Sequence, residues 1–276
     1  MRSMPSRKLG VIGVGNMGSA ILRGVIKAGL FRPDEVTICD LVAEKAAGLA
    51  SELKINLART ASDAARAAST VLLAVKPQTM GECLSEVGDI IDGSRLVISI
   101  AAGISTEFIE KRVRPNARVV RAMPNTPALV GAGATAICGG THATPQDLAE
   151  AELLFGALGK VYRVDESLMD AVTAVSGSGP AYLFLFAECL ERAALACGLP
   201  ASETGDLVTQ TLFGASKLLR ESDEHPSVLR ARVTSPGGTT EAAIAAFNER
   251  GLDEIVRTAV TSALERAREL GGVKKR

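Results

Sequence analysis

Residues 9–18 read LGVIGVGNMG, and this segment decides the fold. Leu9 to Val14 is a short apolar run typical of a buried strand, and a helical pattern continues over Ser19 to Ala28. The Gly-x-Gly-x-x-Gly between them makes a tight turn, lets a pyrophosphate approach the backbone and lets the helix pack on the strand. Alone this pattern is weak, but at a first strand–helix junction it predicts dinucleotide binding. The predicted cofactor contacts are Ile12, Gly13, Val14, Gly15, Asn16, Met17 and Gly18.

Outward from this segment, short apolar runs alternate with helical patterns over residues 1–166. The further strand-like runs are 35–39, 70–75, 96–100, 119–122, 134–138 and 161–164. The runs at 70–75 and 96–100 are apolar throughout, as parallel strands buried on both faces are. We therefore expect residues 1–166 to form a doubly wound α/β domain around a parallel sheet.

From Ser167 onward the strand patterns stop, and helical patterns run nearly to the C-terminus. We expect a domain boundary near residue 166 and an all-α domain over 167–276. Tyr182 to Ala187 is apolar on every side, so this helix should be buried all round. A second subunit would cover it most easily, which favours a homodimer, although a central position in a monomeric bundle would also explain it.

The composition argues against several classes of function. Lysine plus arginine number 31 and aspartate plus glutamate 31, so a surface for polyanions is not expected. With 2 Tyr, 7 Phe and no Trp, base stacking is improbable, and we expect no nucleic acid partner. Five cysteines without a C-x-x-C pair and two histidines argue against a metal site or a disulfide framework, which favours a cytoplasmic location. The longest charge-free stretches are broken by Pro and Gly, so no membrane span is expected.

Three further segments belong to the predicted cofactor site. Asp40 ends the second strand-like run, where an acid accepts hydrogen bonds from the adenosine ribose and repels a 2′-phosphate, which favours NADH. A turn aspartate is the alternative, and Lys45 and Arg59 could still serve a phosphate, so NADPH stays open. Loops after parallel strands border the ligand in such sheets. These loops are Ala74, Val75, Lys76 and Pro77, and Ala101, Ala102 and Gly103.

Two segments interrupt the helical patterns of the second half. SGSGP at 176–180 breaks an apolar helix, and its proline removes a backbone hydrogen bond, so we expect a bend, either structural or facing a ligand. VTSPGGTT at 233–240 leads into a helix that should begin near Glu241. Its glycines can turn backbone N–H groups toward a small anion such as a carboxylate, and Thr239 and Thr240 either cap the helix or donate to the ligand.

Together these motifs resemble the Δ1-pyrroline-5-carboxylate reductase family, over nearly the whole chain. Two of the matching motifs, DAVTAVSGSGPAY and VTSPGGTT, are much more specific than the glycine fingerprint. The motifs are VIGVGNMG (11–18), AVKP (74–77), AAG (101–103), MPNTP (123–127), DAVTAVSGSGPAY (170–182) and VTSPGGTT (233–240).

The resemblance implies reduction of the cyclic imine 1-pyrroline-5-carboxylate to L-proline by hydride from NADPH or NADH, the last step of proline biosynthesis. It implies that helical domains interlock as dimers, which commonly form decamers, with each site between one subunit's cofactor domain and its partner's helical domain. The implied catalytic residue is Thr240, which would hydrogen-bond the ring nitrogen, while Asn125 would lie near the nicotinamide. The implied substrate contacts are Glu166, Ser176, Ser235, Gly237, Gly238, Thr239 and Thr240.

The chain departs from the family pattern at Asp40, at 60–62 and at Arg232, which affects the expected phosphate preference and cofactor contacts. Two alternatives stay open: a reductase of a related cyclic imine or hydroxyacid, and a non-catalytic NAD(P)-binding sensor. A hydroxyacid dehydrogenase would want a lysine base on the long helix after the first domain, but no lysine occurs between Lys160 and Lys217. A sensor would leave the glycine-rich turn at 235–238 unexplained.

Overall fold

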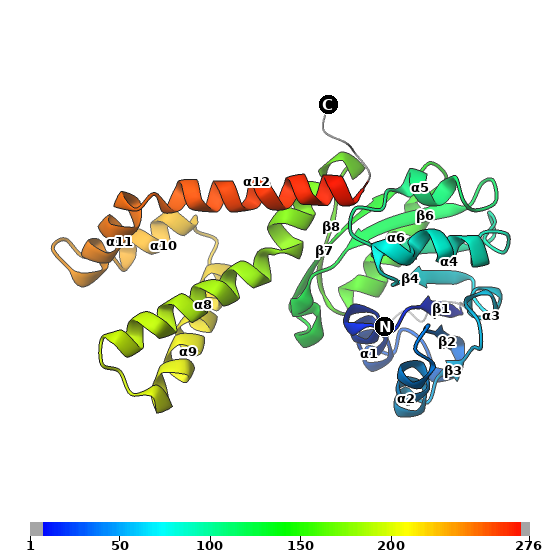
Figure 1. Ribbon diagram of the computed structural model, residues 1–276, viewed down its shortest axis with the longest axis horizontal. Helices are drawn as coiled ribbons and strands as arrows, with labels where there is room; N and C mark the ends of the chain where they lie inside the picture. The colour runs from blue at the N-terminus through cyan, green and yellow to red at the C-terminus, as the bar shows by residue number, and fades with distance from the viewer. Residues whose placement is uncertain (1–7, 272–276) are drawn as a thin grey trace. The chain divides into compact units, whose positions relative to one another are not determined.

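The computed structural model describes residues 8–271, in which the apolar runs of the first half form one sheet (Figure 1). Its order is β3-β2-β1-β4-β5-β6-β7-β8, and β1 and β4 at its centre are buried at every residue. The strands are β1 (Leu9–Ile12), β2 (Val36–Cys39), β3 (Asn56–Leu57), β4 (Thr70–Leu73), β5 (Leu96–Ser99), β6 (Arg118–Met123), β7 (Gly133–Gly139) and β8 (Gly159–Arg163).

The sheet is parallel except at one pair, β6 and β7, which run antiparallel. Residues 124–132 connect these two strands and hold only the 3₁₀ turn η3 (Thr126–Val130). A parallel pair needs a crossover of a dozen or more residues, usually through a helix, so this short connection can only reverse the chain. The sheet is therefore mostly parallel, with one antiparallel pair between β6 and β7.

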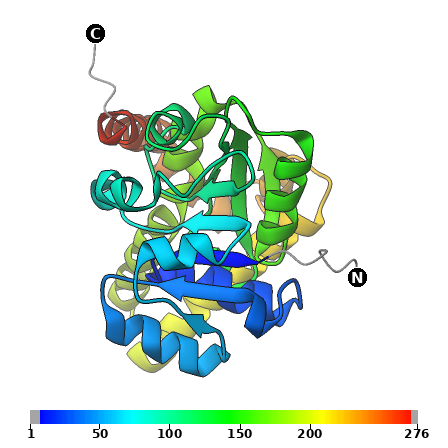
Figure 2. The ribbon, with the colours of Figure 1, turned by 90° about the vertical axis from the view of Figure 1, so that its right-hand side faces the viewer.

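Helices lie on both faces of the sheet (Figure 2). Alternate strand residues point to the two layers: Leu96 and Ile98 of β5 pack in one core, and Val97 packs in the other. This confirms the predicted doubly wound α/β architecture. One core contains residues of α1 (Asn16–Lys27), α2 (Ala43–Leu53) and α6 (Pro145–Gly156), and the other contains residues of α3 (Ala61–Arg66), α4 (Met80–Val87) and α5 (Thr106–Glu110).

The second half is helical, as predicted, with no strand after β8 in the part of the chain that is described. The expected breaks near 198–200, 224–226 and 235–238 fall at or between helix ends, whereas at the SGSGP segment the chain passes through a π-helical turn, η5. The elements of the second half are η4 (Glu166–Leu168), α7 (Met169–Val172), η5 (Thr173–Gly177), α8 (Gly179–Ala196), α9 (Ala201–Glu221), α10 (Pro226–Arg232), α11 (Thr239–Glu249) and α12 (Leu252–Leu270); η1 (Pro33–Glu35) and η2 (Pro77–Thr79) lie in the first half.

The described chain forms two compact units, a sheet unit of residues 8–178 and 263–271 and a helical unit of residues 179–262. The units divide later than the boundary near 166 that the sequence pattern suggests. The reason is that Met169 is fully buried against Ala136 and Cys138 of β7, so α7 packs with the sheet although its pattern is helical. Residues 166–178 therefore belong to the compact sheet unit, although their sequence pattern is that of the helical second half.

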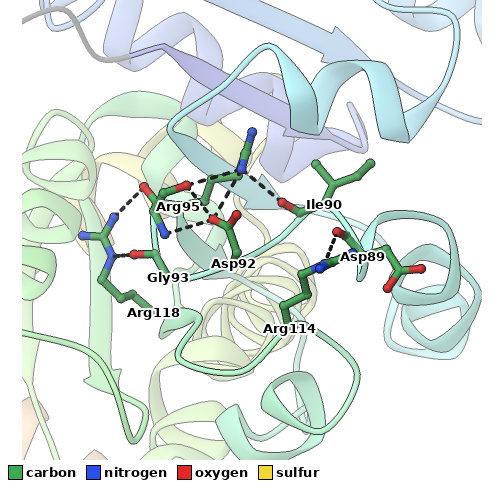
Figure 3. Close-up of polar contacts among 8 residues, drawn as sticks. Asp89, Ile90, Asp92, Gly93, Arg95, Arg114 and Arg118 are labelled. Carbon is green, nitrogen blue, oxygen red and sulfur yellow. Dashed lines mark hydrogen bonds and ion pairs between the residues drawn. The ribbon is translucent and has the colours of Figure 1, made fainter.

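An arginine at the start of β6 fixes the loop that precedes β5 (Figure 3). The Arg118 guanidinium donates to the carbonyl oxygens of Gly93 at 3.1 Å and Ser94 at 3.0 Å. It also pairs with Asp147 of α6 at 2.6 Å, and that carboxylate is almost wholly buried. Because a buried carboxylate without a partner is costly, this contact anchors α6 and the loop to the same strand.

Substitution of Arg118 should therefore lower stability more than loss of a surface pair. We expect Arg118→Ala to reduce the free energy of unfolding by about 2 kcal/mol, because it leaves the buried Asp147 carboxylate short of a partner. Lys111→Ala, which removes an exposed pair with Glu107, should cost less than about 0.5 kcal/mol. Urea denaturation at one protein concentration measures both, and equal losses would contradict the assignment.

Candidate active site

The first glycine of the fingerprint lies between the ends of two neighbouring strands. Gly13 has φ +98°, a conformation that residues with a side chain rarely adopt. A Cβ there would lie 2.6 Å from the carbonyl oxygen of Ala74, which follows β4. The Gly13 N–H donates to the carbonyl oxygen of Cys39, the last residue of β2, at 2.8 Å. The turn after β1 is thus held against β2 and β4 at once.

The other two glycines of the fingerprint face different surroundings. A Cβ on Gly18 would collide with the Gly13 carbonyl oxygen, so the first turn of α1 packs directly on the end of β1. A Cβ on Gly15 would meet nothing within 4 Å, and Gly15 is the N-cap of α1, without a side-chain cap. The free N–H groups in the first turn of α1 therefore lie next to open space, which is the arrangement that a pyrophosphate requires.

Asp40 lies directly beside this glycine turn. Its carboxylate accepts the Val14 N–H at 2.6 Å and the Val42 N–H at 2.8 Å, so both oxygens are fixed in place. Both donors are neutral amides, and nothing in these two contacts cancels the negative charge. Asp40 therefore has a structural task, to close the turn onto the end of β2, and at the same time it holds a negative charge where β2 ends.

The two small-residue loops follow strands adjacent to β1. Ala74 follows β4, and its N–H donates to the carbonyl oxygen of Ile12 at 2.8 Å. The second loop, after β5, contains Gly103 with φ +76°, where a Cβ would lie 3.2 Å from the Ala267 carbonyl oxygen in the last turns of α12. Because β1, β4 and β5 are parallel neighbours, their loops meet at one sheet edge. This edge gathers the predicted cofactor residues 12–18, 40, 74–77 and 101–103.

A nearly buried arginine, which belongs to none of the sequence motifs, lies on β6. Arg121 has a side chain 5% exposed and pairs with Glu166 at 3.4 Å and Asp170 at 3.1 Å. Glu166 also accepts the backbone N–H of Thr106 at 2.7 Å and its hydroxyl at 2.5 Å. The Glu166 carboxylate thus joins η4 to the start of α5. An arginine inside an apolar strand, directly before AMPNTP, is the sequence signal that could have revealed this cluster.

The thiol of Cys138 lies beside this cluster. Cys138 is paired with Arg121 across β6 and β7 and is almost fully buried. Burial, and secondly the Glu166 carboxylate, raise the pKa of its thiol to about 12. Burial likewise raises the pKa of Cys83 to about 12 and that of Cys39 above its usual value. These thiols are therefore neutral near pH 7, and none of the three is poised as a nucleophile.

Asn125 and Ser176, which are 51 residues apart, lie in contact. The Asn125 amide Nδ2 donates to the carbonyl oxygen of Ser176 at 3.2 Å and to its hydroxyl at 3.3 Å. Asn125 Oδ1 accepts the backbone N–H of Ala134 at 2.9 Å. Both ends of the amide are thus used by the protein itself, and the MPNTP segment is joined to the π-helical turn.

In the helical unit, α11 begins at Thr239, slightly earlier than the sequence pattern suggests. The N-cap is Gly238, with no side-chain cap, so the capping role considered for Thr239 and Thr240 is not used. Gly237 has φ +69°, and its N–H donates to the carboxylate of Glu241 at 2.7 Å. The glycine-rich turn therefore already holds one carboxylate, that of the residue directly after the VTSPGGTT motif.

An ion pair precedes this turn. Arg232, at the end of α10, pairs with both oxygens of Glu224, with distances of 2.5 and 2.6 Å. Both residues belong to the helical unit. The charge at Arg232, where the sequence departs from the pattern of the family it resembles, therefore has a local partner. This contact connects the segment before α10 with the start of the glycine-rich turn.

Comparison with known protein families gives two matches along the chain. Residues 166–270 match the model described as pyrroline-5-carboxylate reductase dimerisation. Residues 8–103 match the model described as NADP oxidoreductase, coenzyme F420-dependent. The first match begins where strand patterns give way to helices, and the second covers the glycine fingerprint and both small-residue loops.

Individual relatives match over almost the full chain. The pyrroline-5-carboxylate reductase of Methanosarcina acetivorans is 40% identical, covering 97% of this chain and 99% of the relative. The Escherichia coli reductase is 37% identical, covering 96% and 98%. Among solved structures, the Plasmodium falciparum reductase with NADP bound has a TM-score of 0.88 at 30% identity, covering 98% and 100%. The Coxiella burnetii reductase has a TM-score of 0.89 at 36% identity, covering 96% and 99%.

The open space beside Gly15 gives a test of the cofactor cradle. Gly15→Ala should keep the fold, since its Cβ meets no atom, but should weaken NADPH and NADH binding about tenfold by filling the space for the pyrophosphate. Gly18→Ala should instead lower the melting temperature. Gly48→Ala, at an equally open position inside α2, should leave cofactor binding unchanged and should not lower the melting temperature, because alanine favours the helix. Fluorescence titration and thermal unfolding measure them, and undiminished cofactor binding by the Gly15 variant would contradict the assignment.

Proposed function

The chain belongs to the pyrroline-5-carboxylate reductase family, and we propose how its residues reduce 1-pyrroline-5-carboxylate to L-proline with hydride from NADPH or NADH. The observation that carries the activity is the relationship to reductases at 36–40% identity over nearly the whole length of both chains. The chain is thus an oxidoreductase of proline biosynthesis. Its substrate is a small molecule, and it forms an oligomer.

The cofactor occupies the sheet edge described above, and NAD(P)H supplies the hydride when bound. The free N–H groups at the start of α1 hold the pyrophosphate, and the open side of Gly15 admits it. Asp40 faces the adenosine ribose, and the two small-residue loops border the nicotinamide. The proposed contacts are Ile12, Gly13, Val14, Gly15, Asn16, Met17, Gly18, Asp40, Ala74, Val75, Lys76, Pro77, Ala101, Ala102, Gly103 and Asn125, the last through the loop that it begins.

The substrate carboxylate binds the glycine-rich turn of the helical unit. Support comes from the uncapped start of α11, because no side chain caps its first N–H groups, whereas the Gly237 N–H is used by Glu241. Thr240 Oγ1 hydrogen-bonds the ring nitrogen and so fixes the carbon that receives hydride. A protonated imine is already electrophilic, so the reaction needs positioning more than a strong acid or base. The proposed substrate contacts are Glu166, Ser176, Ser235, Gly237, Gly238, Thr239 and Thr240.

The oligomer is proposed to be a homodimer, further assembled as a decamer, in which residues 167–276 form the dimerisation domain and residues 1–166 the cofactor domain. Large apolar side chains of α8 support this: Phe184 is 60% exposed and Leu185 57% exposed in the single chain. The match of residues 166–270 to the dimerisation model also supports it. Each site would then combine one subunit's cofactor domain with its partner's helical domain.

The proposed setting is the cytoplasm, without nucleic acid or membrane as a partner. Within residues 8–271, no helix combines the length and the apolar character needed to cross a membrane. The balanced charge of 31 basic and 31 acidic residues supports a small acid rather than a polyanion as ligand.

The activity is tested by oxidation of NADH and of NADPH in the presence of pyrroline-5-carboxylate, with the six-membered ring analogue in parallel. We expect turnover with the five-membered imine to exceed that with the analogue. Cofactor binding without turnover on either ring would contradict the proposed function and would favour a sensor.

Thr240→Ala tests the catalytic assignment. It should lower kcat about tenfold to a hundredfold, because the ring nitrogen loses its partner, and should leave the Kd of the cofactor unchanged. Thr211→Ala, on the exposed side of α9, serves as the control and should keep kcat. A kinetically silent Thr240 variant would show that another group holds the ring.

Substitution of Asp40 tests the preference for NADH over NADPH. The intact chain should use NADH at least as well as NADPH, since the fixed carboxylate repels a 2′-phosphate. Asp40→Ser should raise the kcat/KM ratio of NADPH over NADH about tenfold. Asp34→Ser, which removes an exposed acid before β2, should leave the ratio unchanged. A strong NADPH preference of the unaltered chain would refute the role of Asp40.

A further inference from the structure

The π-helical turn η5 contains Ser176, whose carbonyl group cannot make the hydrogen bond of a regular α-helix. In an α-helix the carbonyl oxygen of Ser176 accepts the N–H four residues later. That residue is Pro180, which has no N–H. A half-buried carbonyl group is costly without a donor, so a donor from another segment stabilises this position.

The donor is the side chain of Asn125, from a loop 51 residues earlier in the chain. Its Nδ2 lies 3.2 Å from the Ser176 carbonyl oxygen and 3.3 Å from the Ser176 hydroxyl, and the two amide hydrogens can serve both. The Ala134 N–H, 2.9 Å from Oδ1, fixes which end of the amide faces the turn. Asn125 is 9% exposed, so these bonds are shielded from water.

The bonds of the turn also set the direction of the Ser176 hydroxyl group. A hydroxyl oxygen that accepts a hydrogen bond from Asn125 keeps its own hydrogen for another acceptor. Ser176 is half-buried, so a ligand can reach it. The backbone beneath it is held by the bond from Ser178 N–H to the Thr173 carbonyl oxygen at 2.9 Å, which closes the π-helical turn. Such turns occur frequently at functional sites.

We propose that Asn125 is a positioning residue that acts through Ser176: it donates to the Ser176 carbonyl and hydroxyl oxygens and so presents the Ser176 hydroxyl hydrogen to an oxygen of the bound ligands. This inference rests on the proposed function, because it requires Ser176 to contact a ligand. It gives Asn125 an indirect task, in which its amide holds the protein and does not itself touch the substrate.

A double-mutant cycle tests the proposal. Asn125→Ala should lower kcat/KM for pyrroline-5-carboxylate about tenfold in the intact chain, the equivalent of one well-placed hydrogen bond. In a Ser176→Ala background the same substitution should lower it less than twofold, because no hydroxyl is left to position. Equal losses in both backgrounds would overturn the proposal and make Asn125 a purely structural residue. An unaltered kcat/KM for Ser176→Ala would overturn it too.

Two further variants separate positioning from stability. Asn125→Asp keeps an acceptor for Ala134 but cannot donate to Ser176, so it should reproduce the kcat/KM loss if the alanine variant fails to fold. Asn56→Ala is the matched control: Asn56 Nδ2 also donates to two carbonyl oxygens, of Asp34 and Val36, each at 3.0 Å. It should lower the melting temperature and leave kcat/KM unchanged.

The outcomes also distinguish this inference from the proposed function. If the unaltered chain does not oxidise NADH or NADPH with pyrroline-5-carboxylate, the proposed function is wrong. If the unaltered chain is active but the cycle is additive, only the role of Asn125 is wrong.

Discussion

One steric constraint governs the glycine fingerprint: at Gly13 and Gly18 the backbone passes too close to its neighbours for a side chain. Gly13 lies against the carbonyl group of Ala74, and Gly18 lies against the carbonyl group of Gly13 itself. This closeness places the end of β1 between the ends of β2 and β4. It also directs the start of α1 at the open space beside Gly15, where anion binding follows from the helix geometry.

A second constraint is electrostatic and attaches part of the helical sequence to the sheet. The nearly buried guanidinium of Arg121 needs partners, and it finds them in Glu166 and Asp170 on η4 and α7. Met169 adds apolar burial to the same attachment. Residues 166–178 thus stay with the sheet unit although the dimerisation family model begins at residue 166. The Asn125–Ser176 contact belongs to the same attachment.

Local patterns predicted the features that depend on local chemistry. Apolar runs such as 70–73 became buried strands, and the glycine fingerprint lies at the β1–α1 junction as expected. Contacts between distant residues could not be predicted. Nothing near Arg121 in the sequence indicates Glu166, and Pro180 predicts a bend without indicating that Asn125 donates to Ser176. The antiparallel β6–β7 pair could have been predicted, because residues 124–132 are too few for a crossover.

The sheet unit is not continuous in the sequence, since residues 263–271 return to it after the helical unit. Their contact is intimate: a Cβ on Gly271 would lie 2.6 Å from the carbonyl oxygen of Gly103. During synthesis on the ribosome, the strands emerge long before this last segment does. The loop at 101–103 therefore acquires this neighbour only after the whole helical unit has been synthesised, because residues 263–271 follow that unit in the sequence.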